Sequence, residues 1–149
     1  MNIDFLTKCS DIFYKLSSSE EEYGPELTEI SAGTILYHGT SGEDDFIYPD
    51  GPAWFSDSEK VAMNFASEFQ GGPNPRVFKY EVTSPLKLVL INTSEDMKKL
   101  SEFFDSEYSP RELAERMCDK FDGWHIPNNY PEGSDTLICN PEHCLKRIN

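Results

Sequence analysis

The alternation of hydrophobic and polar residues along the chain predicts short strands interleaved with amphipathic helices. Residues 35–40 form an apolar run ending in the sequence His-Gly-Thr, which is typical of a buried strand with a ligand-facing end. Residues 54–57 predict a second short strand, which runs without a spacer into a helix over residues 60–69. The chain is therefore expected to be organised around these two stretches.

The residues just before the predicted helix at 60–69 carry a helix-capping signal. Ser56 and Glu59 have the spacing of the N-cap and N3 residues of a capping box. Val61, Phe65 and Phe69 then recur every four residues, which predicts one apolar helix face.

The rest of the chain shows further strands, helices and turn-rich segments. An amphipathic helix is expected over residues 3–16, followed by an acidic connector to residue 22. The later patterns predict strands at residues 76–82 and 86–91, helices from Ser94 and from Pro110, a loop at 124–134, and closing strands at 135–140 and 144–148. No glycine-rich phosphate loop follows a predicted strand, which argues against a doubly wound nucleotide fold. A mixed α+β fold is therefore expected.

The composition fits one domain over residues 1–149, with residues 1–22 as its N-terminal helix and connector. Hydrophobic residues make up 38% of the chain, enough for the core of one domain. The 13 basic and 27 acidic residues give a formal charge of −14. This charge repels nucleic-acid phosphates and anionic lipid headgroups, so general nucleic-acid binding and membrane binding are not expected.

Targeting signals and cysteine spacing predict where the protein works. Residues 1–4 lack the basic region of a secretory signal, and no apolar run approaches the length of a membrane span. The four cysteines, at positions 9, 118, 139 and 144, are too sparse and unevenly spaced for a disulfide framework, which favours a reducing compartment. We expect a soluble cytoplasmic protein. An effector delivered into a host cell's cytoplasm would share this composition.

Two of these segments resemble motifs of the ADP-ribosyltransferases, in the His-Tyr-Glu branch that includes diphtheria toxin and the poly(ADP-ribose) polymerases. Residues 38–40 (His-Gly-Thr) and 54–57 (Trp-Phe-Ser-Asp) are similar to the first two motifs of that branch. The third motif is a strand led by a catalytic glutamate, and Asp135 occupies that position. The resemblance covers residues 33–148, and it departs from the family in having Trp54 for tyrosine and Asp135 for glutamate.

The resemblance implies an α+β fold of the split β-sandwich type, with flanking helices and NAD in a cleft between two small sheets. It implies a mono-ADP-ribosyltransferase that uses NAD as substrate, releases nicotinamide and modifies a protein or another acceptor. The arginine-modifying branch has Arg where His38 stands and Glu or Gln where Gly133 stands, so arginine is not the favoured acceptor.

The resemblance also implies roles for individual residues. His38 would bond a ribose hydroxyl, Gly39 would offer its backbone to the carboxamide, and Trp54 would stack on the nicotinamide ring. Asp135 would stabilise the positive charge that develops on the ribose as the nicotinamide bond breaks. The candidate set comprises two catalytic residues, Asp135 and His38, and five NAD-binding residues, His38, Gly39, Thr40, Trp54 and Ser56. Their structural alternatives are a satisfied strand histidine, a turn glycine, a core tryptophan and a strand-capping aspartate.

Several alternatives stay open from the sequence. Glu132 and Glu142 are substitutes for Asp135 as the catalytic carboxylate. A catalytically degenerate domain that binds ADP-ribose or a protein would keep the same fold. An RNA 2′-phosphotransferase also has a strand-borne His-Gly-Thr, but its reaction requires basic residues, and this acidic chain has no evident basic cluster.

The end of the chain carries a possible metal motif. Cys139, His143 and Cys144 lie close together, but without a second paired cluster they fall short of a zinc pattern. No metal is expected, and Cys118 and Cys139 are interpreted as core residues.

Overall fold

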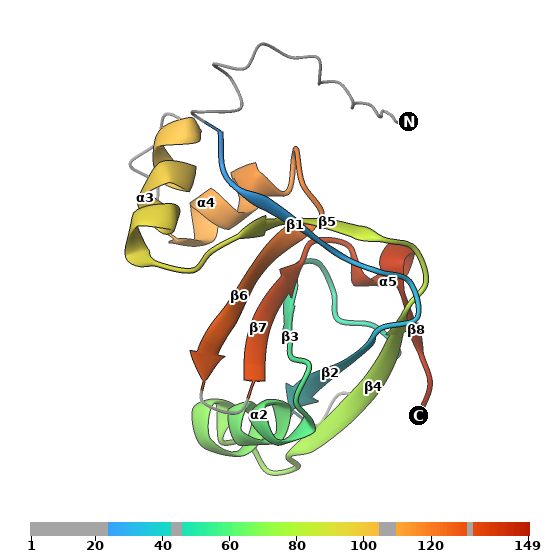
Figure 1. Ribbon diagram of the computed structural model, residues 1–149. Coiled ribbons are helices and arrows are strands. Elements are labelled where there is room, and N and C mark those ends of the chain that lie inside the picture. Colours follow the sequence, from blue (N-terminus) through green and yellow to red (C-terminus); the bar gives the residue numbers. More distant parts are fainter. Residues whose placement is uncertain (1–23, 43–45, 105–109, 131–132) are drawn as a thin grey trace.

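The computed structural model describes residues 24–42, 46–104, 110–130 and 133–149. It shows a mixed α+β fold in which short helices surround two β-sheets (Figure 1). The helix expected over residues 3–16 and the connector that follows it lie outside the described residues.

The larger sheet has five strands in the order β1-β5-β6-β7-β3. These strands are β1 Leu27–Ile30, β5 Leu86–Leu90, β6 Gly123–Tyr130, β7 Gly133–Ile138 and β3 Ala53–Phe55. Only the pair β5 and β6 is parallel among them, and a parallel pair requires a crossover connection. Helices α3 (Ser94–Phe103) and α4 (Pro110–Met117) supply this crossover and lie together beside one end of the sheet (Figure 1).

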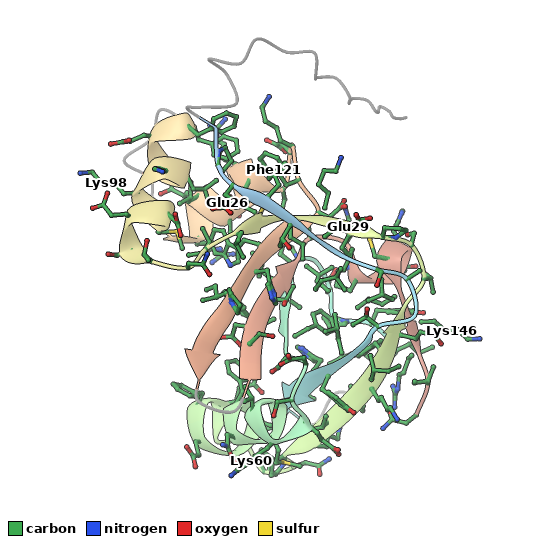
Figure 2. The ribbon with its side chains drawn as sticks, viewed as in Figure 1. Glu26, Glu29, Lys60, Lys98, Phe121 and Lys146 are labelled. Carbon is green, nitrogen blue, oxygen red and sulfur yellow. A yellow bond between two sulfur atoms is a disulfide. The ribbon has the colours of Figure 1, made fainter. Side chains whose placement is uncertain are left out.

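A hydrophobic cluster joins these two helices to the larger sheet. Its buried members are Val89, Ile91, Leu100, Leu113, Met117, Trp124, Leu137 and Cys139. Phe121 packs against this cluster and lies near α4, as Figure 2 shows. Leu100, Leu113 and Met117, which lie at apolar positions of the two helices, are therefore buried in this cluster, whereas Phe103 at the end of α3 is 40% exposed.

The smaller sheet has three antiparallel strands in the order β2-β4-β8. They are β2 Ile35–Thr40, β4 Arg76–Val82 and β8 Leu145–Arg147. Two backbone hydrogen bonds, of 2.8 and 2.9 Å between Tyr37 and Ser56, connect β2 to the end of β3. A second hydrophobic cluster takes residues from both sheets, Leu36, Phe55, Phe78, Tyr80, Val82, Leu86, Leu88, Ile138 and Leu145.

The helix after β3 begins two residues later than the capping signal predicts. Helix α2 spans Glu59–Asn64, and the side chain of its N-cap, Ser58, accepts a hydrogen bond from the backbone N–H of Val61. The predicted cap at Ser56 is wrong. Its Oγ instead accepts from the backbone N–H of Ser58 at 3.1 Å, and its backbone is already bonded to β2.

The chain then continues as a π-helix, η1, over Phe65–Gln70. Gly71 ends it with φ of 64°, and its N–H donates to the carbonyl of Ala66 in the i→i+5 pattern. The wider turn interrupts the four-residue repeat of apolar side chains. Val61 is buried, but Phe69 is 70% exposed, so the single apolar face predicted for residues 60–69 is wrong at its end.

The segment before Asp135 is not the loop that its proline and asparagine content predicts. Residues 123–130 form strand β6, and β7 begins at Gly133. Pro127, which has no N–H to donate, is tolerated because it lies where the register of β6 against β7 shifts, between Ile126 and Tyr130. Strand β1 is also additional, and residues 141–144, the last of which was predicted to begin a closing strand, form the short helix α5 (Pro141–Cys144).

Two cysteines expected to be free are joined. Cys118, after α4, and Cys139, after β7, form a disulfide across 21 residues. Cys144 is free and partly buried. The disulfide corrects the expectation that the cysteines are unpaired, and it removes the compositional argument for a reducing compartment.

Among the described segments, no helix has the length and apolar character needed to cross a membrane.

Candidate functional site

One pocket gathers residues from β2, β3, β7 and the helical segment α2/η1. Four of the predicted site residues line it, namely Gly39, Trp54, Ser56 and Asp135. The other lining residues are Tyr37, Phe55, Val61, Ala62 and Phe65. Segments distant in the sequence thus meet under α2.

Strand alternation explains why these residues share one side. Tyr37 and Gly39 are two positions apart on β2 and so face the same way. On β7 the same rule puts Asp135 on the side of Leu137, which lies opposite Trp54 in the pairing of β3 with β7. The backbone bridge to Ser56 then aligns the two sheets at this point.

Gly39 allows α2 to lie directly against β2. A β-carbon at this position would collide with the backbone carbonyl of Ala62. Gly39 is therefore required by packing, whatever its role toward a ligand.

Two of the aromatic residues that line the pocket, Trp54 and Phe65, also contact aromatic rings outside it. Trp54 also contacts Trp124 in the cluster under α3 and α4, with ring centroids 6.1 Å apart. Phe65, at the start of η1, stacks on Phe69 at 5.8 Å. The sequence predicted Phe65 only as part of an apolar helix face, because periodicity does not reveal which side of a helix faces a pocket.

The pocket is narrow. Its cavity measures about 10 Å³, room for about one water molecule. A nicotinamide ring is larger than this, so its entry requires lining side chains to shift.

Asp135 lies at the pocket in a partly buried position on β7. The backbone N–H of the preceding residue, Ser134, donates a 2.9 Å hydrogen bond to Oδ1 of Asp57. The Oγ of Ser134 is buried without a hydrogen-bond partner among the described residues. Of the substitute carboxylates, Glu142 is exposed on α5 and does not line this pocket, and Glu132 lies outside the described residues.

His38 is buried on the opposite face of β2 from Gly39. Its Nδ1 atom lies 2.7 Å from the backbone oxygen of Trp54, and its ring packs against Phe55 with centroids 5.2 Å apart. Burial lowers the pKa of His38, and the bond to the Trp54 carbonyl partly opposes this. Neither His38 nor Thr40, which is also buried, is among the described residues that line this pocket.

A second histidine, which the sequence did not single out, lies on the same face of the sheet as Phe55. The Nδ1 atom of His125 on β6 lies 2.7 Å from Oγ1 of Thr136 on β7. Burial lowers the pKa of His125, while the charge of Asp57 raises it to a smaller extent.

No group of three potential metal ligands is found within the described ranges. The side chains available at the pocket are thus one carboxylate, from Asp135, the hydroxyls of Ser56 and Tyr37, and four aromatic rings, beside backbone groups.

Comparison with known proteins gives a fold but no family. No protein-family model matches the chain, and no curated protein sequence matches it. Among solved structures, the chain is similar to a chain in the crystal structure of the M. tuberculosis MbcT-MbcA toxin-antitoxin complex. The TM-score is 0.53 at 12% sequence identity, and the match covers 89% of this chain and 88% of that chain. At this identity the likeness shows a common fold alone.

Proposed function

We propose that the protein is an NAD-dependent ADP-ribosyltransferase, which releases nicotinamide and transfers ADP-ribose to a protein or another acceptor. The observation that best supports this proposal is that Gly39, Trp54 and Asp135 line one pocket although they belong to three different strands. These are the residues to which the motif resemblance attributes nicotinamide binding and charge stabilisation.

The pocket offers the parts that the reaction needs. The aromatic rings of Trp54 and Phe65 at the pocket suit a nicotinamide ring, and the backbone groups of Gly39 suit its carboxamide. Departure of nicotinamide leaves positive charge on the ribose, which the Asp135 carboxylate would stabilise in the transition state. The Nδ1 atom of His38 is hydrogen-bonded to the backbone oxygen of Trp54. Only its Nε2 atom could therefore bond to a ribose hydroxyl.

The RNA 2′-phosphotransferase alternative receives less support. Transfer of an RNA phosphate requires cationic groups at the reacting centre. No lysine, arginine or histidine is among the described residues that line the pocket. A chain of net charge −14 adds a repulsive field for RNA.

The test is nicotinamide release from NAD by the purified protein, with and without cell lysate to supply an acceptor. We expect release in wild type, with label from adenine-labelled NAD appearing on an acceptor. Because the similar solved chain comes from a toxin–antitoxin complex, expression in bacteria with measurement of growth and NAD gives a cellular readout. No release with any acceptor would contradict the transferase proposal and favour a binding module.

Asp135→Asn identifies the carboxylate that acts. We expect it to lower turnover by about 10²–10³-fold with little change in NAD affinity, because it removes charge stabilisation from the transition state but keeps the side chain's size. The exposed acid Glu142 provides the control, and Glu142→Gln should behave as wild type. Full activity in Asp135→Asn would transfer the role to Glu132 or Glu142.

A further inference from the structure

The residues on both sides of Asp135 are held by side chains from outside β7. On one side, the backbone N–H of Ser134 donates to Oδ1 of Asp57 at 2.9 Å. On the other side, Nδ1 of His125 lies 2.7 Å from Oγ1 of Thr136. Asp135 therefore lies between two anchored neighbours.

The bond to Asp57 replaces missing strand pairing. Strand β3 pairs with β7 only as far as Phe55 opposite Thr136, so the N–H of Ser134, which by strand alternation points to the same side as that of Thr136, lies beyond the end of this ladder. A backbone N–H at such a point needs another acceptor, and a carboxylate is a strong one. Asp57 supplies it from the connection between β3 and α2.

That connection also forms part of the pocket. Ser56 lines the pocket and bonds to Tyr37, and Ser58 caps α2. The segment before Asp135 packs tightly on this connection: a β-carbon at Gly133 would lie 2.6 Å from Cβ of Ser58 and 3.0 Å from Oδ1 of Asp57. The carboxylate of Asp57 thus joins the two sides of the pocket at its rim.

We propose that Asp57 is a positioning residue, whose hydrogen bond to the Ser134 N–H holds Asp135 at the correct distance from the pocket wall formed by Trp54. Asp57 is exposed and is not among the described residues that line the pocket, so it acts through the backbone. The inference rests on the proposed function, because it assigns the reaction to Asp135.

The experiment compares Asp57→Ala with Asp57→Asn. Asparagine keeps an acceptor oxygen for the Ser134 N–H and removes the charge, whereas alanine removes both. We expect Asp57→Ala to lower kcat for nicotinamide release by about 10- to 100-fold with KM little changed, since a displacement of about 1 Å can cost about 10²-fold. Asp57→Asn should recover most of this loss, and Glu59→Ala, which removes an exposed acid from the first turn of α2, should resemble wild type.

Hydrogen exchange gives a readout that does not depend on catalysis. The Ser134 amide should exchange faster in Asp57→Ala than in wild type or Asp57→Asn. If Asp57→Ala fails to fold, Gly133→Ala provides a second displacement of the same segment, with Asp57 intact, and should show the same loss of kcat.

The outcomes separate this inference from the proposed function. If wild type is active and Asp57→Ala is fully active, the positioning role alone is overturned. The same holds if wild type is active and Asp57→Asn is as impaired as Asp57→Ala. Wild type without nicotinamide release overturns the proposed function and the positioning role with it. Both the proposed function and the positioning role are supported if kcat falls in Asp57→Ala and recovers in Asp57→Asn. The Ser134 amide should then exchange faster in Asp57→Ala only.

Discussion

The Nδ1 atom of His38 lies 2.7 Å from the backbone oxygen of Trp54, so a side chain of the smaller sheet is bonded to the edge strand of the larger one. A carbonyl only accepts hydrogen bonds, so Nδ1 carries the proton and neutral His38 has its lone pair on Nε2. The histidine of the His-Gly-Thr sequence therefore has a structural contact that holds the tryptophan of the second motif.

Stability should fall as the pH drops below about 6.5. Burial lowers the pKa of both His38 and His125 in the folded state from the ordinary value of 6.5. The unfolded chain then binds protons more readily, so the histidine contribution is fully present above pH 6.5 and is lost as the pH falls toward the folded pKa values. Urea unfolding between pH 8 and 5 measures this loss of free energy.

Carboxylates also titrate at the acid end of this range. The test therefore compares, between variants, the slope of the unfolding free energy against pH. Replacing His38 and His125 together by glutamine should flatten the dependence between pH 7 and 5.5. Replacing the exposed His143 by glutamine should leave it unchanged. Equal slopes in all three proteins would show that the buried histidines do not govern acid sensitivity.

The aromatic walls of the pocket should contribute to NAD affinity. We expect Trp54→Ala and Phe65→Ala each to weaken binding, by about 0.5–1.5 kcal/mol beyond the effect of lost contact area, and Trp54→Phe to keep much of it. Phe69→Ala is the matched control, because Phe69 stacks on Phe65 but is 70% exposed and does not line the pocket. Calorimetry measures the NAD affinities. If Phe69→Ala weakens NAD binding as much as Phe65→Ala, Phe65 does not contact the nicotinamide ring in the pocket.

Gly39→Ala should destabilise the fold as well as the site. The new methyl group would meet the backbone oxygen of Ala62, which cannot move without shifting α2. Overpacking of this kind costs about 1–3 kcal/mol in unfolding free energy. Chemical denaturation measures the loss, and a Gly39→Ala protein as stable as wild type would contradict the tight contact between β2 and α2.

Breaking the Cys118–Cys139 disulfide should lower the stability of the fold around β7, the strand that carries Asp135. A loop of this length corresponds to about 3 kcal/mol in the chain-entropy model. Replacing both cysteines by alanine should lower Tm and abolish any effect of a reductant on it. Cys144→Ala should keep the reductant effect, because Cys144 is free. Identical melting of wild type with and without reductant would argue against the bond.

Local patterns in the sequence were enough to predict β2, β3, β4 and β5. Each is an apolar or alternating run bounded by turn residues, and a strand of this kind needs no knowledge of its partner to be recognised. The short motifs at residues 38–40 and 54–57 were likewise visible without a structure, because each is contiguous. Gly39, Trp54 and Ser56 could be named as site candidates on that basis, and Asp135 from its place at the start of a later predicted strand.

Only the tertiary structure brought those four residues to one pocket and turned His38 to the other face of β2. It also made a strand of residues 123–130, because pairing on both sides and a bulge at Pro127 outweigh a local composition that is typical of a loop. The disulfide, the place of Phe65 in the pocket wall and the bond of Asp57 to Ser134 each join segments far apart in the chain. Such contacts depend on how sheets and helices pack, which no local periodicity along the sequence records.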